Sequence, residues 1–238
     1  MHVASSSRRI VAEAVGTALL VAAVVGSGIM AQRLATDHAV TLLANTVATG
    51  GALVAILLVF GPISGAHLNP AVTISLAVAK HITPRLAAGY VVAQVLGAIA
   101  GAMLANVMFD LSIVSWSETV RSGSAKLISE AVATFGLLGV VICVGRTRPA
   151  ITPLAVAAYI VAAYWFTAST SFANPAVTIG RAFSDTYAGI RPADIGGFVA
   201  AQALGATVGA VFFSWLVAPA THARADSYEA SKPDPSIE

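Results

Sequence analysis

The sequence predicts an all-α membrane protein with six transmembrane helices and two short re-entrant half-helices in an inverted repeat. Three observations predict this fold class. Hydrophobic residues make up 57% of the 238 residues and charged residues only 10%, which lies outside the usual range of soluble domains. Six long stretches are nearly free of charge, and about 20 apolar residues suffice for a helix to cross a bilayer. The phrase LNPAVT at residues 68–73 returns as ANPAVT at 173–178.

Each uncharged stretch is expected to hold one transmembrane span. Two of the stretches have more residues than a span requires, and the surplus lies at the two Asn-Pro-Ala phrases. The stretches cover residues 10–31, 39–66, 86–109, 127–145, 149–180 and 195–221.

The doubled phrase is part of a longer internal repeat. AEAVGT at 12–17 pairs with SEAVAT at 129–134, and VAQVLGAIAGA at 92–102 pairs with AAQALGATVGA at 200–210. Each half therefore carries Glu, then Asn-Pro-Ala, then Gln with a GxxxG step, in the same order. Because each half holds an odd number of spans, the second half must enter the membrane from the opposite side.

The repeat divides the chain into five parts. We expect a cytoplasmic N-terminus at 1–9, a first repeat at 10–109 and an extracytoplasmic connecting loop at 110–126. A second repeat follows at 127–217, and the polar, proline-containing tail at 218–238 is expected to be disordered in the cytoplasm.

The distribution of Lys and Arg places both termini in the cytoplasm by the positive-inside rule. The side of the termini carries the larger number of these residues, and the net charge of only +2 argues against a nucleic-acid partner. The side of the termini has Arg8, Arg9, Lys80, Arg85, Arg146, Arg148, Arg224 and Lys232, and the other side has Arg33, Arg121, Lys126, Arg181 and Arg191.

Each Asn-Pro-Ala phrase predicts the start of a short helix. Asn is a favourable N-cap and Pro is favoured at the first helical position, so helices are expected to begin at Asn69 and Asn174, within segments 64–79 and 169–183. These helices are too short to span a bilayer. Non-helical backbone at membrane depth is tolerated only where it is packed in protein or lines an aqueous cavity. Two half-helices that enter from opposite faces can therefore meet with their N-termini at the midplane.

These features together resemble the aquaporin, or major intrinsic protein, family over about residues 10–217. The two phrases Asn69-Pro70-Ala71 and Asn174-Pro175-Ala176 stand in inverted halves, each preceded by a span with a Glu in an AEAVGT-like context. The segment SFANPAVTIGR further resembles the corresponding segment of bacterial aquaglyceroporins associated with arsenic-resistance operons, especially the rhizobial type. The resemblance implies an aquaporin-like fold and a homotetramer in the lipid bilayer of a bacterial inner membrane.

The resemblance also implies a passive channel for water and small neutral solutes. The expected solutes are glycerol, urea and undissociated metalloids such as arsenite, with methylated arsenicals as further candidates. Asn69 and Asn174 cap with their side-chain oxygens, which leaves their amide NH2 groups to donate to a passing water or hydroxyl. The positive ends of the two half-helices disfavour cations. His67 matches a pore-facing position of the family.

Glu13 and Glu130 lie within spans, where an ionisable residue is a functional candidate by default, including as part of a proton pathway. Their equivalent places in the two halves favour a second interpretation. In this interpretation, both are buried hydrogen-bond acceptors that support the non-helical loop before each half-helix. The matching Glu has this role in the family.

The second phrase departs from the family at Val177, where most members have an Arg in a narrow outer filter. Two further filter positions of the family correspond to Thr49 and Ser171 when residues are counted from the two Asn-Pro-Ala motifs. The fourth position is Tyr164 when the fifth span is aligned on its proline, which we prefer, and Ala162 when it is counted without gaps. A branched apolar side chain in place of a guanidinium, opposite the small Thr49, predicts a wider constriction that passes solutes larger than water.

Arg181 lies one turn beyond Val177 on the half-helix, about 6 Å outward at about 1.5 Å per residue. Two interpretations stay open: it lends positive potential to an outer vestibule, or it is an ordinary arginine of the membrane interface. An ion- or proton-coupled secondary transporter is the alternative function, since inverted repeats and broken helices are common to both classes. An enzyme is disfavoured, because the spans contain no His/Asp/Glu metal set and no Ser/His/Asp constellation. No catalytic residue, metal or cofactor is expected.

Overall fold

The computed structural model describes residues 4–218, and within this range the chain forms helices and no strand. Six helical segments are long and apolar enough to cross a membrane, as the sequence predicts. Four are single helices: α1 (Ser6–Leu34), α2 (His38–Ser64), α4 (Pro84–Met108) and α9 (Pro192–Leu216). The expected disordered tail begins at residue 218, so all but its first residue lies outside the described range.

The fourth and fifth spans are continuous helical segments that are not α-helical throughout. The fourth consists of α5 (Ser124–Gly139), a π-helical turn (Val140–Val144) and α6 (Gly145–Thr147). The fifth consists of a 3-10 turn (Pro149–Ile151) and α7 (Thr152–Phe166).

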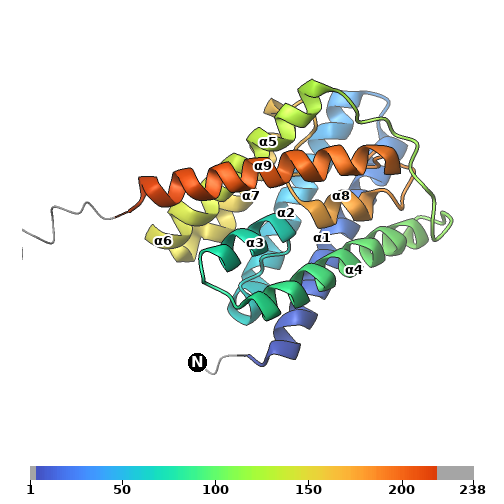
Figure 1. The fold of residues 1–238 in the computed structure, drawn as a ribbon. Coiled ribbons are helices and arrows are strands. Elements are labelled where there is room, and N and C mark those ends of the chain that lie inside the picture. Colours follow the sequence, from blue (N-terminus) through green and yellow to red (C-terminus); the bar gives the residue numbers. More distant parts are fainter. Residues whose placement is uncertain (1–3, 219–238) are drawn as a thin grey trace, which may run out of the picture.

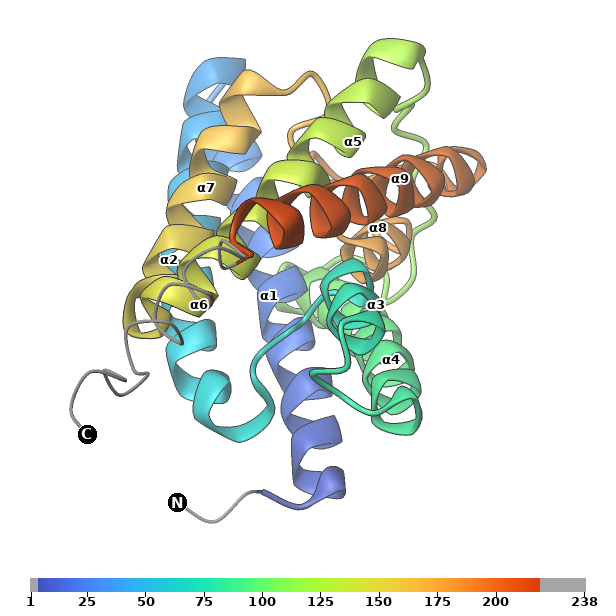
Figure 2. The same cartoon turned by 60° about the vertical axis from the view of Figure 1, so that its left-hand side comes forward.

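Two short helices, α3 (Pro70–Val78) and α8 (Pro175–Arg181), lie between the long ones (Figure 1, Figure 2). Each begins as predicted, with Asn at the N-cap and Pro in the first turn. The Asn69 side-chain oxygen accepts from the backbone N–H of Ala71 at 2.9 Å, and the Asn174 oxygen accepts from that of Ala176 at 3.0 Å. These bonds satisfy backbone donors that no preceding helical turn can satisfy.

The GxxxG steps bring two pairs of long helices into close contact. A Cβ atom at Gly97 or Gly101 of α4 would collide with the backbone of α1, and one at Gly205 of α9 would collide with the backbone of α5. Small residues at these points let the helix backbones approach closely. The first and third spans of each half are therefore packed by the same means.

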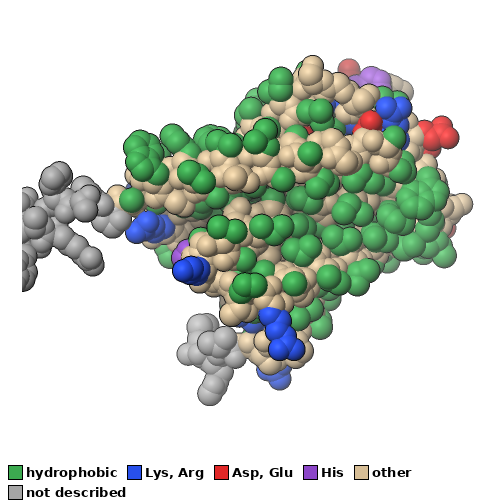
Figure 3. Space-filling view, viewed as in Figure 1, with side chains coloured by type: hydrophobic (Ala, Val, Ile, Leu, Met, Phe, Trp, Pro, Cys, Tyr) green, Lys and Arg blue, Asp and Glu red, His purple; other side chains and the backbone are tan. Residues whose placement is uncertain are grey.

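The surface and the interior have the polarity expected of a membrane protein. Apolar side chains cover the middle of the molecule in Figure 3. Lys and Arg lie near the end where the chain begins, and side chains of both signs lie at the opposite end. In contrast, Glu13, Gln94, Glu130 and Gln202 are completely buried. The polar groups of the spans thus face inward, where they support the two half-helices.

Candidate functional site

The loop that precedes α3 is held by Glu13 on α1. The carboxylate accepts hydrogen bonds from the backbone N–H groups of His67 and Leu68 at 3.0 and 2.7 Å. It also accepts from the Ser64 hydroxyl at 2.6 Å and the Gln94 amide at 2.7 Å. Leu68 has a φ of 49°, a left-handed conformation that is unfavourable for a residue with a side chain. The carboxylate therefore stabilises a loop that would not keep this shape alone.

Glu130 on α5 does the same for the loop that precedes α8. It accepts from the backbone N–H groups of Phe172 and Ala173 at 2.9 and 2.8 Å, and from the Gln202 amide at 2.6 Å. Ala173 has a φ of 47°, so the strained backbone recurs as well. The protein contains an internal cavity between the half-helices and the long helices, and neither Glu13 nor Glu130 lines it. This geometry favours loop support over a proton pathway.

The N-termini of the two half-helices are joined by reciprocal hydrogen bonds. The Asn69 Nδ2 donates to the carbonyl oxygen of Ala173 at 2.8 Å, and the Asn174 Nδ2 donates to that of Leu68 at 2.8 Å. The expectation that both amide NH2 groups are wholly free is therefore wrong. Each group commits one of its two hydrogens to the opposite loop, because the two capped ends meet directly, and one hydrogen remains on each amide.

A cavity of about 360 Å³ runs past this junction. It extends from Pro149 and Thr152 on one side to Arg181 on the other, and both Asn69 and Asn174 line it. Most of its wall is apolar, with a small number of polar groups. His67 also lines it, with its Nδ1 at 3.1 Å from the Thr73 hydroxyl.

The four preferred filter positions line the same cavity: Thr49, Tyr164, Ser171 and Val177. The Tyr164 hydroxyl lies 3.5 Å from the Thr49 hydroxyl. The alternative position, Ala162, is exposed on the outside of α7 and lies away from the cavity. The Ser171 hydroxyl is buried without a hydrogen-bond partner among the described residues, and the residue lines the cavity.

Arg181 lies inside the protein rather than at the membrane interface. Its side chain is 2% exposed and lines the cavity beyond Val177. The Nε donates to the carbonyl oxygen of Ala188, and the guanidinium carbon lies 3.4 Å from the centre of the Phe172 ring. The interpretation of Arg181 as an interface arginine is therefore wrong, because the loop after α8 folds back over this side chain.

Comparison with known proteins identifies the kind of molecule that has this geometry. The family model described as Major intrinsic protein matches residues 1–163. The chain belongs to the major intrinsic protein family, the family of the aquaporins. It is therefore a multi-pass membrane channel for water and small solutes, and it is not an enzyme. Family membership also decides against the coupled transporter.

Two relatives and one solved structure show how close the likeness is. The chain is 54% identical to aquaglyceroporin AqpS of Rhizobium meliloti (strain 1021), over 90% of this chain and 92% of that protein. It is 31% identical to aquaporin NIP6-1 of Arabidopsis thaliana, over 89% of this chain and 70% of that protein. The X-ray structure of the aquaglyceroporin from Plasmodium falciparum has a TM-score of 0.65 at 22% identity, and the match covers 88% of this chain and 96% of that one. The last match shows a common fold.

Two glutamines, to which no role was assigned from the sequence, also hold the half-helices of this aquaporin-family channel. Gln94 donates both to Glu13 and, at 2.9 Å, to the Thr73 hydroxyl of α3. Gln202 makes the equivalent contacts in the other half, with Glu130 and, at 2.8 Å, with a threonine of α8. The signal was present, because both the Gln and the Thr recur in the internal repeat. Phe172 and Arg121, which lie beside Arg181, carry no such signal.

Proposed function

We propose that the channel passes neutral solutes wider than water through a filter formed by Thr49, Tyr164, Ser171 and Val177. The observation that carries this proposal is Val177 on the wall of the cavity, at the position where most of the family has an arginine. A valine side chain leaves open the space that a guanidinium would occupy. Valine also lacks the hydrogen-bond donors of a guanidinium. A solute must therefore make its polar contacts with the hydroxyl groups on the other sides of the filter.

The proposed solutes are glycerol, urea, undissociated metalloid hydroxides such as arsenite, and methylated arsenicals. All are small and uncharged when they pass, and all carry donors and acceptors that can replace lost water contacts. The hydroxyls of Thr49 and Ser171 and the remaining amide hydrogens of Asn69 and Asn174 are suitable partners. The identity to a bacterial aquaglyceroporin over most of both chains supports this solute class.

Arrangement in the membrane is part of the same proposal. We infer a homotetramer in a bacterial inner membrane, with both termini in the cytoplasm and the two repeats at 10–109 and 127–217. The gathering of Lys and Arg at the end of the molecule where the chain begins supports this orientation (Figure 3).

Stopped-flow light scattering on proteoliposomes tests the proposed function. Vesicles that contain the purified protein should take up glycerol and urea faster than empty vesicles of the same composition, and arsenite uptake measured in parallel should also rise. The rates should not change when ionophores collapse the proton and cation gradients, because the flux is passive. Rapid water flux without any solute flux would contradict the proposed wide filter.

A further inference from the structure

Arg181 is a buried cation that has no anionic partner among residues 4–218. It is 2% exposed, and within residues 4–218 the ion pair found is between Arg191 and Asp194. The Nε of Arg181 is bonded to a backbone carbonyl, but its two Nη atoms make no hydrogen bond to the described part of the chain. Because the side chain lines the cavity, these donors are available to whatever occupies it. Charge burial without pairing is costly and is expected mainly where it serves a function.

The Phe172 ring holds Arg181 in place. The guanidinium carbon stands 3.4 Å from the ring centre, within the range at which the π face attracts a cation, and this attraction is stronger where water is excluded. Phe172 is itself fixed, since its backbone N–H donates to Glu130 and its ring contacts that of Phe198. The position of the charge is thus set by the same loop that carries Ser171 of the filter.

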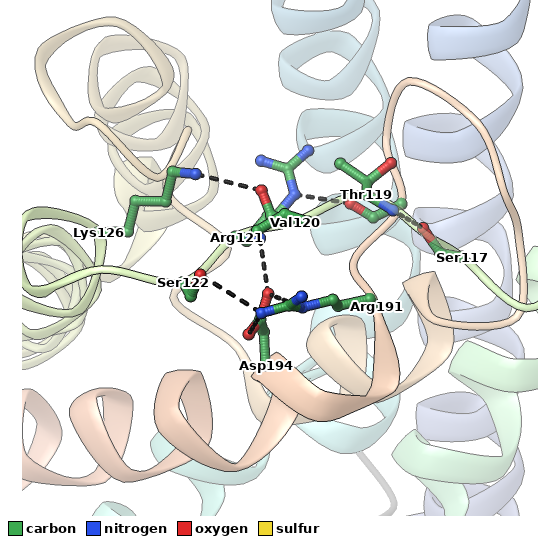
Figure 4. Close-up of polar contacts among 9 residues, drawn as sticks. Ser117, Thr119, Val120, Arg121, Ser122, Lys126, Arg191 and Asp194 are labelled. Carbon is green, nitrogen blue, oxygen red and sulfur yellow. Dashed lines mark hydrogen bonds and ion pairs between the residues drawn. The ribbon is translucent and has the colours of Figure 1, made fainter.

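Arg121, from the loop that connects the two repeats, adds a second guanidinium over the same ring, at 4.9 Å from its centre. It donates to the carbonyl oxygens of Gly189, Tyr187 and Ser169 at 2.6, 3.2 and 3.4 Å. The backbone of this loop is anchored in turn, because the Arg121 N–H donates to the Asp194 carboxylate at 2.7 Å (Figure 4). The connecting loop therefore ties together both segments that flank α8.

We propose that Arg181, held against Phe172 in a site whose flanking segments are tied together by Arg121, is the charge-selective residue of this channel, while Val177 sets its width. This inference rests on the proposed function. In most of the family one filter arginine both narrows the pore and repels cations. Here the two tasks are divided between residues one helical turn apart. A guanidinium that lies against an aromatic ring at the cavity wall keeps a positive field at the outer mouth without closing the passage to wide neutral solutes.

The opposed half-helices also present positive ends to the cavity, so the inference needs a test that separates their effect from that of Arg181. Urea and guanidinium are suitable probes, because they have nearly the same planar shape and differ in charge. Their uptake into proteoliposomes is measured for the wild type and for Arg181→Met, Arg181→Gln and Arg181→Lys at equal protein content. Lys126→Met is the matched control, since it removes one positive charge from the first turn of α5, outside the cavity.

We expect the wild type to pass urea and to exclude guanidinium. In Arg181→Met and Arg181→Gln the ratio of guanidinium to urea permeability should rise about tenfold to a hundredfold, as the removal of a unit charge close to the path at an effective dielectric constant of about 20 implies. Arg181→Lys should keep the ratio low because it retains the charge. Lys126→Met should match the wild type.

A ratio that stays at the wild-type value in Arg181→Gln, with urea flux retained, would overturn the inference and assign cation exclusion to the half-helix dipoles alone. A rise of the ratio in Arg181→Lys equal to that in Arg181→Met would also overturn it, since the side chain would then act through shape. Should Arg181→Met fail to reach the membrane, Arg181→Gln, which keeps amide donors, carries the same expectation. If the wild type itself passes no urea, the proposed function fails rather than this inference.

Discussion

Replacement of Val177 by Arg is expected to convert the channel toward a narrower, water-preferring pore. Val177 is 5% exposed and lines the cavity together with Thr49, Tyr164 and Ser171. The arginine side chain can extend only into this cavity, because the protein around Val177 is closely packed. The volume of the cavity is about 360 Å³. Solutes as wide as glycerol or a trihydroxy metalloid therefore lose clearance, while a single water can still exchange hydrogen bonds with the added donors.

The expected loss can be given a magnitude. In an enzyme pocket, one methylene of misfit changes discrimination between substrates by roughly 10- to 200-fold, and by analogy glycerol permeability should fall by about that factor. Water permeability should fall much less, and the loss should increase with solute size, with methylated arsenicals affected most if they are substrates. The backbone positions of residues 177 and 181 are also one turn apart, about 6 Å along the helix axis, which sets the scale for the distance between the two charges. Two like charges at that distance repel by about 3 kcal/mol at an effective dielectric constant of about 20.

The repulsion requires a control for folding. Permeabilities of water, glycerol and arsenicals should be compared at matched membrane abundance for the wild type, Val177→Arg and Val177→Met. Val177→Met adds bulk without charge and should show part of the size-graded loss, which separates width from electrostatics. If every solute falls by one common factor in Val177→Arg, or if none falls, Val177 does not set selectivity and the filter assignment is wrong.

Three further outcomes are expected. Proton flux through the wild-type channel should be far below water flux in proteoliposomes, because the opposed half-helices and the apolar wall add to the proposed effect of Arg181 in disfavouring a positive charge; proton conduction comparable with water conduction would contradict this. Asn174→Asp should impair glycerol flux and admit cations, since a carboxylate replaces the amide that donates to the Leu68 carbonyl; unchanged glycerol flux without new cation conductance would place Asn174 outside the conduction path. Glu130→Leu should destabilise the protein by about 2–6 kcal/mol, as two buried N–H groups, those of Phe172 and Ala173, lose their acceptor. Thermal unfolding in detergent should show this loss, with a smaller loss in Glu130→Gln, and an unchanged melting temperature would argue against loop support.

The helical elements and their symmetry can be deduced from the amino-acid sequence. Spans follow from composition, because a helix in lipid must be apolar over about 20 residues. The half-helices begin where predicted because Asn-Pro is a local signal, with Asn69 and Asn174 as caps. The supporting role of Glu13 and Glu130 could be proposed from their equal places in the two repeats. These inferences use only residues that are adjacent in the sequence or equivalent in the two repeats, so they require no tertiary structure.

Which side chains meet in the cavity is known only from the folded structure. Ala162 and Tyr164 are two residues apart, and two residues turn a helix by about 200°. An alignment that is uncertain by two positions therefore cannot tell which face of the helix lines the cavity. The cavity contains Tyr164, and Ala162 faces outward. Likewise, the placement of Arg121 and Arg181 over one ring depends on the paths of two loops. Sequence spacing constrains a regular helix, but a loop takes its path from the distant groups that bind it, and those contacts exist only in the folded chain.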